Sequence, residues 1–182
     1  MTVSVYLPDS VPGPPPGVLA PSPPSLAGLR IAVLDNGKPN ADVVMTAAAD
    51  ALAARTGARV SLVTKKGPLG LSANAAIPAA EDRFELVLAE SDVVITGAAD
   101  CGSCTAYSVV DAIALERAGR PTVVTTTTQF QPIASTLSSS FGAPETRLLV
   151  LPHPIGGTDE ATLRQWAEAA TDRLIALFTG AA

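Results

Sequence analysis

The chain has 182 residues, of which 47% are hydrophobic and 16% charged, a balance that excludes a disordered chain and is typical of one packed domain. Only 4% of the residues are aromatic, so Ala, Val, Leu and Ile must fill the core, and a stacking surface for nucleic-acid bases is not expected. The formal net charge of −5 and the absence of an apolar run near ~20 residues argue against nucleic acid or a membrane as partner.

Residues 1–28 are predicted to form a proline-rich N-terminal arm. Half of the 16 prolines fall between Pro8 and Pro24, where they prevent a helix or a central strand, although Ser4–Leu7 could pair as a short edge strand. No Lys or Arg precedes Arg30, so the basic region of a signal peptide is missing and a cytoplasmic location is expected. We expect an α/β domain over residues 29–182 that folds without the arm.

From Leu29 onward, β-branched runs alternate with alanine-rich stretches, which is typical of βα units. The predicted strands are Arg30–Leu34, Arg59–Thr64, Asp92–Thr96, Thr122–Thr126 and Arg147–Leu151. The predicted helices run from an N-cap at Asn40 to Gly57, around Phe84, Val87 and Leu88, over Cys104–Ala118, over about Pro132–Ser140, and onward from an N-cap at Thr158. The last helix has a buried stripe of Leu163, Trp166, Ala167, Ala170, Leu174 and Leu177. This pattern predicts one doubly wound, Rossmann-like α/β domain, with a parallel sheet of about five strands and helices on both faces.

Right-handed crossovers bring every βα loop of such a sheet to its C-terminal edge. A functional site at this edge would draw on the loop that follows each strand. These loops are residues 35–40, 64–66, 97–104, 125–130 and 152–158.

Two cysteines supply the sharpest chemical signal. Cys101 and Cys104 stand where a buried strand gives way to a helix, and the positive helix end favours the thiolate of the more exposed sulfur. Cys101 is therefore the candidate nucleophile, and Cys104 either resolves a mixed disulfide or supplies an S–H donor. Asp100 opposes the thiolate unless it is turned away to cap the helix. The alternative is a pair of small buried hydrophobic residues.

The single histidine, His153, follows the fifth strand between two prolines. The topology brings it to the same edge as Cys101, where it could act as proton donor or base, although a lone histidine is often only a surface or core residue. Gly156 and Gly157 come before a predicted helix N-terminus and could bind a substrate carboxylate or phosphate. An ordinary capped turn is an equal alternative.

Further polar residues are predicted at the same edge. The residues assigned to substrate binding are Asp35, Asn36, Lys38, Thr127, Thr128 and Gln129. Lys38 could stabilise a thiolate, and the threonines and the Gln129 amide could bind an oxyanion, although solvated turn residues and β-branched strand residues explain them equally well. Asp111, seven residues after Cys104, could orient His153 or a basic residue, or be a surface carboxylate.

Metal and nucleotide binding are not expected. Cys101, Cys104 and His153 could supply three metal ligands, but a closed zinc site needs four, and the chain has no further Cys or His. Neither GxGxxG nor GxxxxGK[ST] occurs, so neither a dinucleotide nor a P-loop nucleotide is expected. We therefore predict no cofactor.

The stretch from Asp100 to Glu116, DCGSCTAYSVVDAIALE, resembles the UGSC family, whose motif can carry selenocysteine at its first position. The resemblance includes residues 34–40 and 152–154, and it implies that Cys101 occupies the selenocysteine position and Cys104 that of its partner. Other recurrent positions match Asp35, Asn36, Lys38, Asp111, Glu116 and His153. The family is distantly similar to the selenoprotein subunits of glycine and proline reductases, which implies thiol chemistry without fixing a substrate.

Together these features predict an enzyme whose Cys101 attacks a small polar substrate, with His153 as acid or base. The reaction would be a cleavage or rearrangement of the lyase, isomerase or hydrolase type, or a thiol oxidoreduction that uses a thiol reductant. The alternative is a non-catalytic redox sensor or a sulfur or selenium carrier. The alanine-rich helices and low charge also predict a homo-oligomer.

Overall fold

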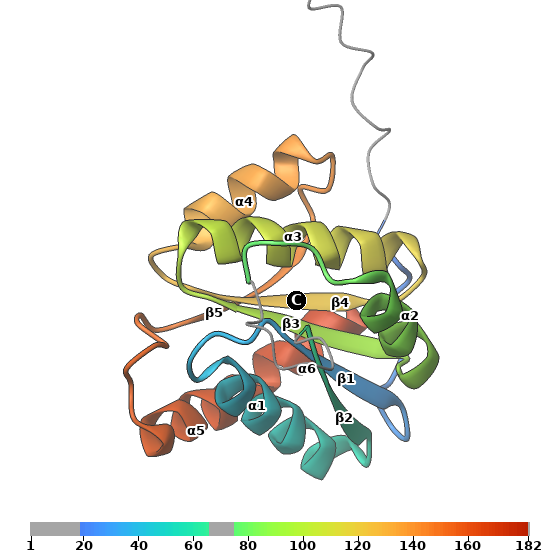
Figure 1. Cartoon of the computed structure of the whole chain (residues 1–182). Coiled ribbons are helices and arrows are strands. Elements are labelled where there is room, and N and C mark those ends of the chain that lie inside the picture. Colours follow the sequence, from blue (N-terminus) through green and yellow to red (C-terminus); the bar gives the residue numbers. More distant parts are fainter. Residues whose placement is uncertain (1–18, 66–74, 182) are drawn as a thin grey trace, which may run out of the picture.

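The protein is built on one sheet of five parallel strands in the order β2-β1-β3-β4-β5 (Figure 1). The structure is a computed structural model that describes residues 19–65 and 75–181. The strands are β1 (Arg30–Asp35), β2 (Arg59–Thr64), β3 (Val93–Ala99), β4 (Thr122–Thr127) and β5 (Arg147–Leu151). The predicted α/β class and the parallel five-stranded sheet are confirmed.

Helices cover both faces of this sheet, as Figure 1 shows. One layer holds α1 (Ala41–Thr56), α5 (Glu160–Ala169) and α6 (Thr171–Thr179). The other holds α2 (Glu81–Glu90), α3 (Gly102–Arg117) and α4 (Gln131–Ser140). Because helices lie on both sides, the central strands β1, β3 and β4 are buried on both faces, whereas the edge strand β2 leaves Arg59 and Leu62 exposed.

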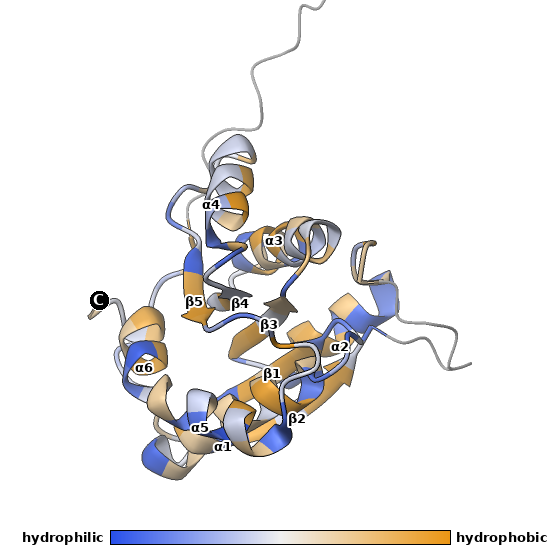
Figure 2. Ribbon diagram, turned by 90° about the vertical axis from the view of Figure 1, so that its left-hand side faces the viewer, coloured by the Kyte–Doolittle hydropathy of each residue, from blue (hydrophilic) through white to orange (hydrophobic). Residues whose placement is uncertain are grey.

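The core divides into two parts that follow the alternation of side chains along each strand. Ile31 and Val33 of β1 pack with α1, α5 and α6, whereas Ala32 and Leu34 pack with Val87 of α2 and residues of α3. The strands accordingly form an apolar centre inside helices that keep hydrophilic faces outward (Figure 2). Every residue of β3 and β4 is buried.

The last predicted helix is two helices in the structure, which break at Ala170. The hydroxyl of Thr171 donates to the carbonyl oxygens of Glu168 and Ala167, at 2.7 and 3.5 Å. A hydroxyl that bonds back to the preceding turn competes with the helical pattern, which provides a local reason for the break. The apolar stripe nevertheless remains on one side, because Leu163, Ala167 and Leu174 are fully buried.

Two predicted N-caps differ in detail from the structure. Asn40 stands at the N-cap position of α1, but its backbone is left-handed and its side chain does not cap the helix. The predicted last helix begins one residue later than expected, because the N-cap of α5 is Asp159 rather than Thr158. The carboxylate of Asp159 accepts from the backbone N–H of Thr162 at 2.9 Å, and these hydrogen bonds lower the pKa of Asp159.

The described end of the predicted arm contacts the domain. Ala20 and Leu26 are buried. The backbone N–H of Ala20 donates to Glu116 at 2.7 Å, and its carbonyl accepts from Arg147 at 2.9 Å. Glu116 and Arg147 themselves form a buried ion pair, so this segment completes the hydrogen bonding of two buried charges. The predicted strand Ser4–Leu7 lies outside the described residues, and the arm boundary at residue 28 stays a prediction.

Within the described ranges, we find no helix with the length and apolar character needed to cross a membrane.

Deleting residues 1–26 should therefore destabilise the domain, contrary to what composition alone predicts for the arm. The deletion removes Leu26 from the core and leaves Glu116 and Arg147 with unsatisfied hydrogen-bonding groups, which should cost about 3–6 kcal/mol. Chemical denaturation followed by circular dichroism measures the loss. Deletion of residues 1–18 is the matched control, since it removes none of the contacts described above, and equal stability of the two truncated proteins would contradict the prediction.

Candidate functional site

The site begins at an irregularity in β3 that sequence reasoning missed. The predicted strand ends at Thr96, but β3 continues to Ala99, and its register against β4 shifts between Gly97 and Ala99. Ala98 adopts a positive φ of 51°, which is costly for a residue with a Cβ. Such a bulge turns the strand and re-aims the residues that follow it, which here are Asp100 and Cys101.

Gly97 is required where β3 and β4 approach each other. Its φ is 110°, and a Cβ at this position would collide with the backbone oxygen of Thr125 and lie 2.9 Å from its nitrogen. The side-chain amide of Asn36 donates a short hydrogen bond to the Gly97 carbonyl. The end of β3 is therefore fixed from both neighbouring strands.

Asn36 and Asp35, both predicted to bind substrate, form hydrogen bonds with backbone groups in this structure, and their binding of a substrate stays a prediction. Asn36 is fully buried, and its side-chain oxygen accepts from the backbone N–H of Lys38 at 3.0 Å. Asp35 is 5% exposed and accepts from the N–H of Gly37 at 2.7 Å. These contacts shape the loop between β1 and α1.

Cys101 and Cys104 are joined by a disulfide at the start of α3. Cys101 is the N-cap residue of this helix and is half-buried, whereas Cys104 is 2% exposed. The backbone oxygen of Cys101 accepts from the N–H and the hydroxyl of Thr105, which fixes the first turn. The two sulfurs of the pair therefore differ in access to solvent, and Cys101 is the more accessible.

Asp100 neither caps α3 nor stands free beside Cys101. Its carboxylate accepts from the backbone N–H of Gly156 at 2.8 Å, which joins the loop after β3 to the loop after β5. Asn40 makes a second connection, because its side-chain amide donates to the carbonyl oxygens of Ile155 and Thr158 at 3.0 and 2.8 Å. Side-chain contacts thus tie the loops after β1, β3 and β5 together.

The predicted anion site at Gly156 and Gly157 is not a free helix N-terminus. The N–H of Gly156 is used by Asp100, and the helix that follows is capped by Asp159. Carboxylates thus accept from the N–H groups of Gly156 and Thr162, two of the donors that an anionic group could use. The structure therefore favours the alternative of a capped turn.

His153 lies at the same edge of the sheet as Cys101, because both follow the C-terminal ends of parallel strands. His153 is exposed, and its Nδ1 shares a hydrogen bond of 3.1 Å with the hydroxyl of Thr127. The ring of Phe130 lies beside it, with the ring centroids 5.8 Å apart. The peptide bond between His153 and Pro154 is cis. The hydroxyl of Thr127 therefore engages one of the two ring nitrogens, Nδ1.

Thr128 and Gln129 are exposed in the turn that follows β4, at the same edge as His153. The preceding Thr127 is fully buried, and its hydroxyl shares a hydrogen bond with His153. Lys38 is half-buried in the loop after β1. Substrate binding by Lys38, Thr128 and Gln129 stays a prediction.

Asp111 pairs with a basic residue and does not contact His153. It forms a buried ion pair with Lys65, and both side chains are 3% exposed. Burial raises the pKa of the Asp111 carboxyl, an effect that the nearby Lys65 ammonium opposes. Of the two predicted roles, orientation of a basic residue is the one that agrees with this geometry.

Three charged residues with structural roles were missed or left unassigned by sequence reasoning. The sequence analysis places Lys65 and Lys66 in the loop after the second strand but does not pair Lys65 with Asp111. Lys66 lies outside the described residues. Glu116 and Arg147 form the second buried pair. An arginine at the first position of an apolar strand, RLLVL, was a signal that a buried partner exists.

The described residues contain no cluster of three or more His, Cys, Asp or Glu side chains that could hold a metal ion.

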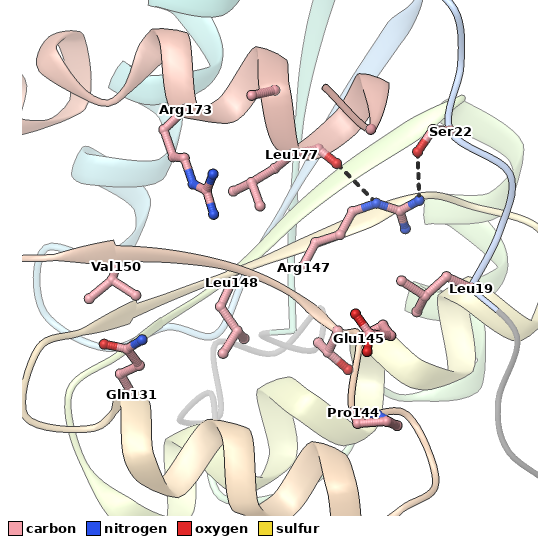
Figure 3. Close-up of a pocket in the computed structure, with 13 residues that line it drawn as sticks. Leu19, Ser22, Gln131, Pro144, Glu145, Arg147, Leu148, Val150, Arg173 and Leu177 are labelled. Atoms are coloured by element: carbon pink, nitrogen blue, oxygen red, sulfur yellow. Dashed lines mark hydrogen bonds between the residues drawn. The ribbon is translucent and has the colours of Figure 1, made fainter. Parts of the chain in front are cut away.

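A cavity of about 540 Å³ lies along β5, away from the cysteine pair (Figure 3). Arg173 of α6 and Gln131 of α4 point into it from opposite sides, and Leu148 and Val150 form its floor. Ser22 and Leu177 bind the Arg147 guanidinium at its other end. Neither Cys101 nor His153 lines this cavity, so it does not form part of the site at the sheet edge.

The fold and the site define a class: doubly wound α/β proteins that carry a CxxC pair at the start of the helix after the third strand. The chain belongs to the UGSC family, whose family model matches residues 9–180. The family resemblance expected from the residues around Cys101 is thereby confirmed.

Comparisons with characterised proteins add little. No curated protein matches the chain. Among solved structures, it is similar to RecJ in complex with Mn²⁺ from Thermus thermophilus, at 20% sequence identity and a TM-score of 0.42. The match covers 81% of this chain but only 19% of the RecJ chain.

Replacing Gly97 by Ala should cost about 3 kcal/mol or more of folding free energy, because the new Cβ meets backbone atoms that cannot rotate away. Gly102→Ala is the matched control, since a Cβ at Gly102 meets nothing within 4 Å and alanine favours a helix by about 0.5–1 kcal/mol. Urea denaturation of both variants makes the comparison. A loss below about 1 kcal/mol for Gly97→Ala would show that β3 and β4 are not in close backbone contact at this point.

Proposed function

We propose that this protein is a thiol-dependent enzyme in which Cys101 forms a covalent bond with a small polar substrate. The asymmetry of the cysteine pair is the observation that carries the proposal: Cys101 is half-buried at the N-cap of α3, whereas Cys104 is 2% exposed. Once the disulfide is reduced, the unpaired N–H groups of the helix start favour a thiolate at Cys101. The thiolate is the nucleophilic form of cysteine.

His153 is the proposed acid or base. Its Nδ1 contacts Thr127 at 3.1 Å, which supports a fixed ring orientation with Nε2 available for proton transfer. The bond between Asp100 and Gly156 supports a short path between the two residues, because it joins the loop of Cys101 to that of His153. Exposed Thr128 and Gln129 would bind the oxygen on which negative charge develops.

In a reductive cleavage, the Cys101 thiolate attacks a substrate carbon, and a C–S bond forms as the bond to the leaving group breaks. His153 donates a proton to that leaving group. The Cys104 thiolate then attacks the Cys101 sulfur, which forms the disulfide. The carbon departs with the electron pair of the C–S bond and takes up a proton, so a neighbouring carbonyl that stabilises the carbanion is required. An external dithiol reduces the disulfide and is itself oxidised.

A non-redox lyase, isomerase or hydrolase would need only Cys101 and an acid or base. The disulfide favours the redox route, since Cys104 is bonded to Cys101 and could resolve an adduct on it. A carrier or sensor is the second candidate. It is favoured by the exposure of Gly102 and Ser103 beside Cys101, since a carrier must offer its sulfur to a partner protein.

Replacing Cys104 by Ser separates these possibilities. The reduced variant is incubated with the small-molecule fraction of a cell extract and examined by intact-protein mass spectrometry. A substrate adduct on Cys101 should accumulate, because the thiol that would release it is absent, whereas wild-type protein should show the disulfide instead. Cys101→Ser is the control and should form no adduct. An adduct that Cys104→Ser and wild-type protein form to the same extent would assign the non-redox route. The absence of any adduct would contradict the proposed enzyme and favour the redox sensor.

Adding His153→Gln to the Cys104→Ser protein should slow adduct formation by about 10²–10⁴-fold, the usual loss when acid or base assistance is removed. Alkylation of Cys101 by iodoacetamide should change far less, because that reaction needs no proton transfer to a leaving group. Both rates are followed by mass spectrometry on the same preparation. Equal slowing of the two reactions would mean that His153 acts on the thiolate itself and not on the substrate.

The predicted partners are a small-molecule substrate, a thiol reductant and further copies of the chain. The homo-oligomer and the cytoplasmic location both rest on composition and stay predictions.

A further inference from the structure

The buried ion pair of Lys65 and Asp111 lies between the end of β2 and the middle of α3. Each of its members also bonds to the segment that precedes α2. Lys65 Nζ donates to the carbonyl oxygen of Ile77 at 3.3 Å, and Asp111 accepts from the backbone N–H of Ala79 at 2.8 Å. The pair therefore holds residues 77–79 through two hydrogen bonds that carry charge, which are the strong kind.

The same segment contacts the cysteine pair. Ala75 packs in one cluster with Ala99 and Cys104, and Cys101 lies partly buried against this cluster. Ala75 is 5% exposed and Cys104 2%, so the small side chain of Ala75 helps to exclude solvent from the inner sulfur. Ala75 is only two residues from Ile77, where the hydrogen bond from Lys65 fixes the backbone.

We infer that Lys65 and Asp111 are positioning residues that hold residues 77–79 and so keep the adjoining Ala75 against Cys104, so that Cys101 is the sulfur that reagents and substrates reach. The inference rests on the proposed function, because selective access matters only if Cys101 performs thiol chemistry. Neither residue touches the reacting atoms in this scheme. Both act through the segment that they hold.

Selective access has a chemical consequence for the disulfide. An external dithiol attacks the Cys101 sulfur, a new S–S bond forms, and Cys104 leaves as a thiolate with the electron pair of the broken bond. The second thiolate of the reductant then attacks the reductant sulfur that is bonded to Cys101. The mixed disulfide breaks, Cys101 leaves as a thiolate, and the reductant departs as its cyclic disulfide. Attack on Cys104 would instead leave the mixed disulfide on the buried sulfur, away from His153 and the substrate.

Stability alone gives a poor reason for this ion pair. Burial of two charges costs free energy that their attraction often fails to exceed, and apolar residues of similar size are commonly as stabilising. The pKa of the Asp111 carboxyl is raised, because the cost of burying its charge outweighs the attraction of the Lys65 ammonium. The pair is better explained by the two backbone groups that it holds than by net stabilisation.

The test measures which cysteine reacts in the full-length, reduced protein. After reduction with a phosphine, a brief pulse of iodoacetamide labels the free thiols, and peptide mass spectrometry gives the ratio of Cys101 to Cys104 alkylation. Wild-type protein should favour Cys101 by at least about tenfold, as expected for a half-buried thiol at a helix N-terminus against a fully buried one. Asp111→Asn should lower this ratio about tenfold by releasing the segment over Cys104.

Asp111→Asn leaves Lys65 buried without its partner and could fail to fold, so Lys65→Met/Asp111→Asn is the second variant. It leaves no unpaired charge, and it should lower the ratio in the same direction. Glu116→Gln is the matched control, because it breaks the other buried ion pair, which involves neither the cysteines nor residues 75–79. The control should reduce stability while the labelling ratio stays within about twofold of wild type.

A ratio that stays unchanged in a folded double variant would overturn the positioning role and leave the proposed nucleophile intact. An equal fall in Glu116→Gln would also overturn it, because general loosening would then explain the effect. A wild-type ratio near one would contradict both the positioning role and the proposed role of Cys101. Since no substrate is used, failure to find the substrate of the enzyme does not affect the result.

Discussion

The close approach of β3 and β4 at Gly97 and Thr125 is the constraint on which the candidate site depends. No side chain fits between the two backbones at this point, so only glycine is compatible with it. The bulge that follows, through Ala98, turns the chain before Asp100 and Cys101. Without this turn, β3 would continue along the sheet, and the chain would not place Cys101 at the N-cap of α3.

Beyond this point, polar side chains join loops that are far apart in sequence. Asn36 bonds to the carbonyl of Gly97, Asp100 to the N–H of Gly156, and Asn40 to the carbonyls of Ile155 and Thr158. Each bond satisfies a backbone group of another loop, so the cysteine and histidine loops are held by a common network. Asn36, Asn40 and Asp100 thus support the loops that carry Cys101 and His153.

Two buried ion pairs join α3 to distant parts of the chain. Lys65 and Asp111 hold the segment before α2 near Cys104, and Glu116 and Arg147 hold the N-terminal segment through Ala20. Both acids come from α3, the helix that begins at the cysteine pair. The helix that begins at the cysteine pair therefore also binds the segment before α2 and the N-terminal segment, and its buried charges are satisfied by backbone groups as well as by their partners.

The sequence by itself determined the architecture, because alternating apolar runs and alanine-rich stretches specify buried strands and covering helices. It also located the cysteine pair at a strand-to-helix junction and His153 at the end of β5, since both follow from the order of elements. The predicted strand Arg147–Leu151 has the bounds found in the structure. The bounds of β3 were missed, because its last residues, Gly97 to Ala99, carry no β-branched side chain and extend the strand only through contacts with β4.

Only the tertiary structure decided the strand order and the partners of the polar side chains. Periodicity reports which face of an element is buried, but not which distant residue lies opposite, so Asp111 and Lys65, or Asp100 and Gly156, could not be paired from sequence. For the same reason the backbone partners of Asn36 and Asp35 could not be predicted, because a polar residue in a loop has the same sequence signature whether it binds a ligand or a backbone group. Burial distinguishes the two cases, and burial is a property of the assembled fold.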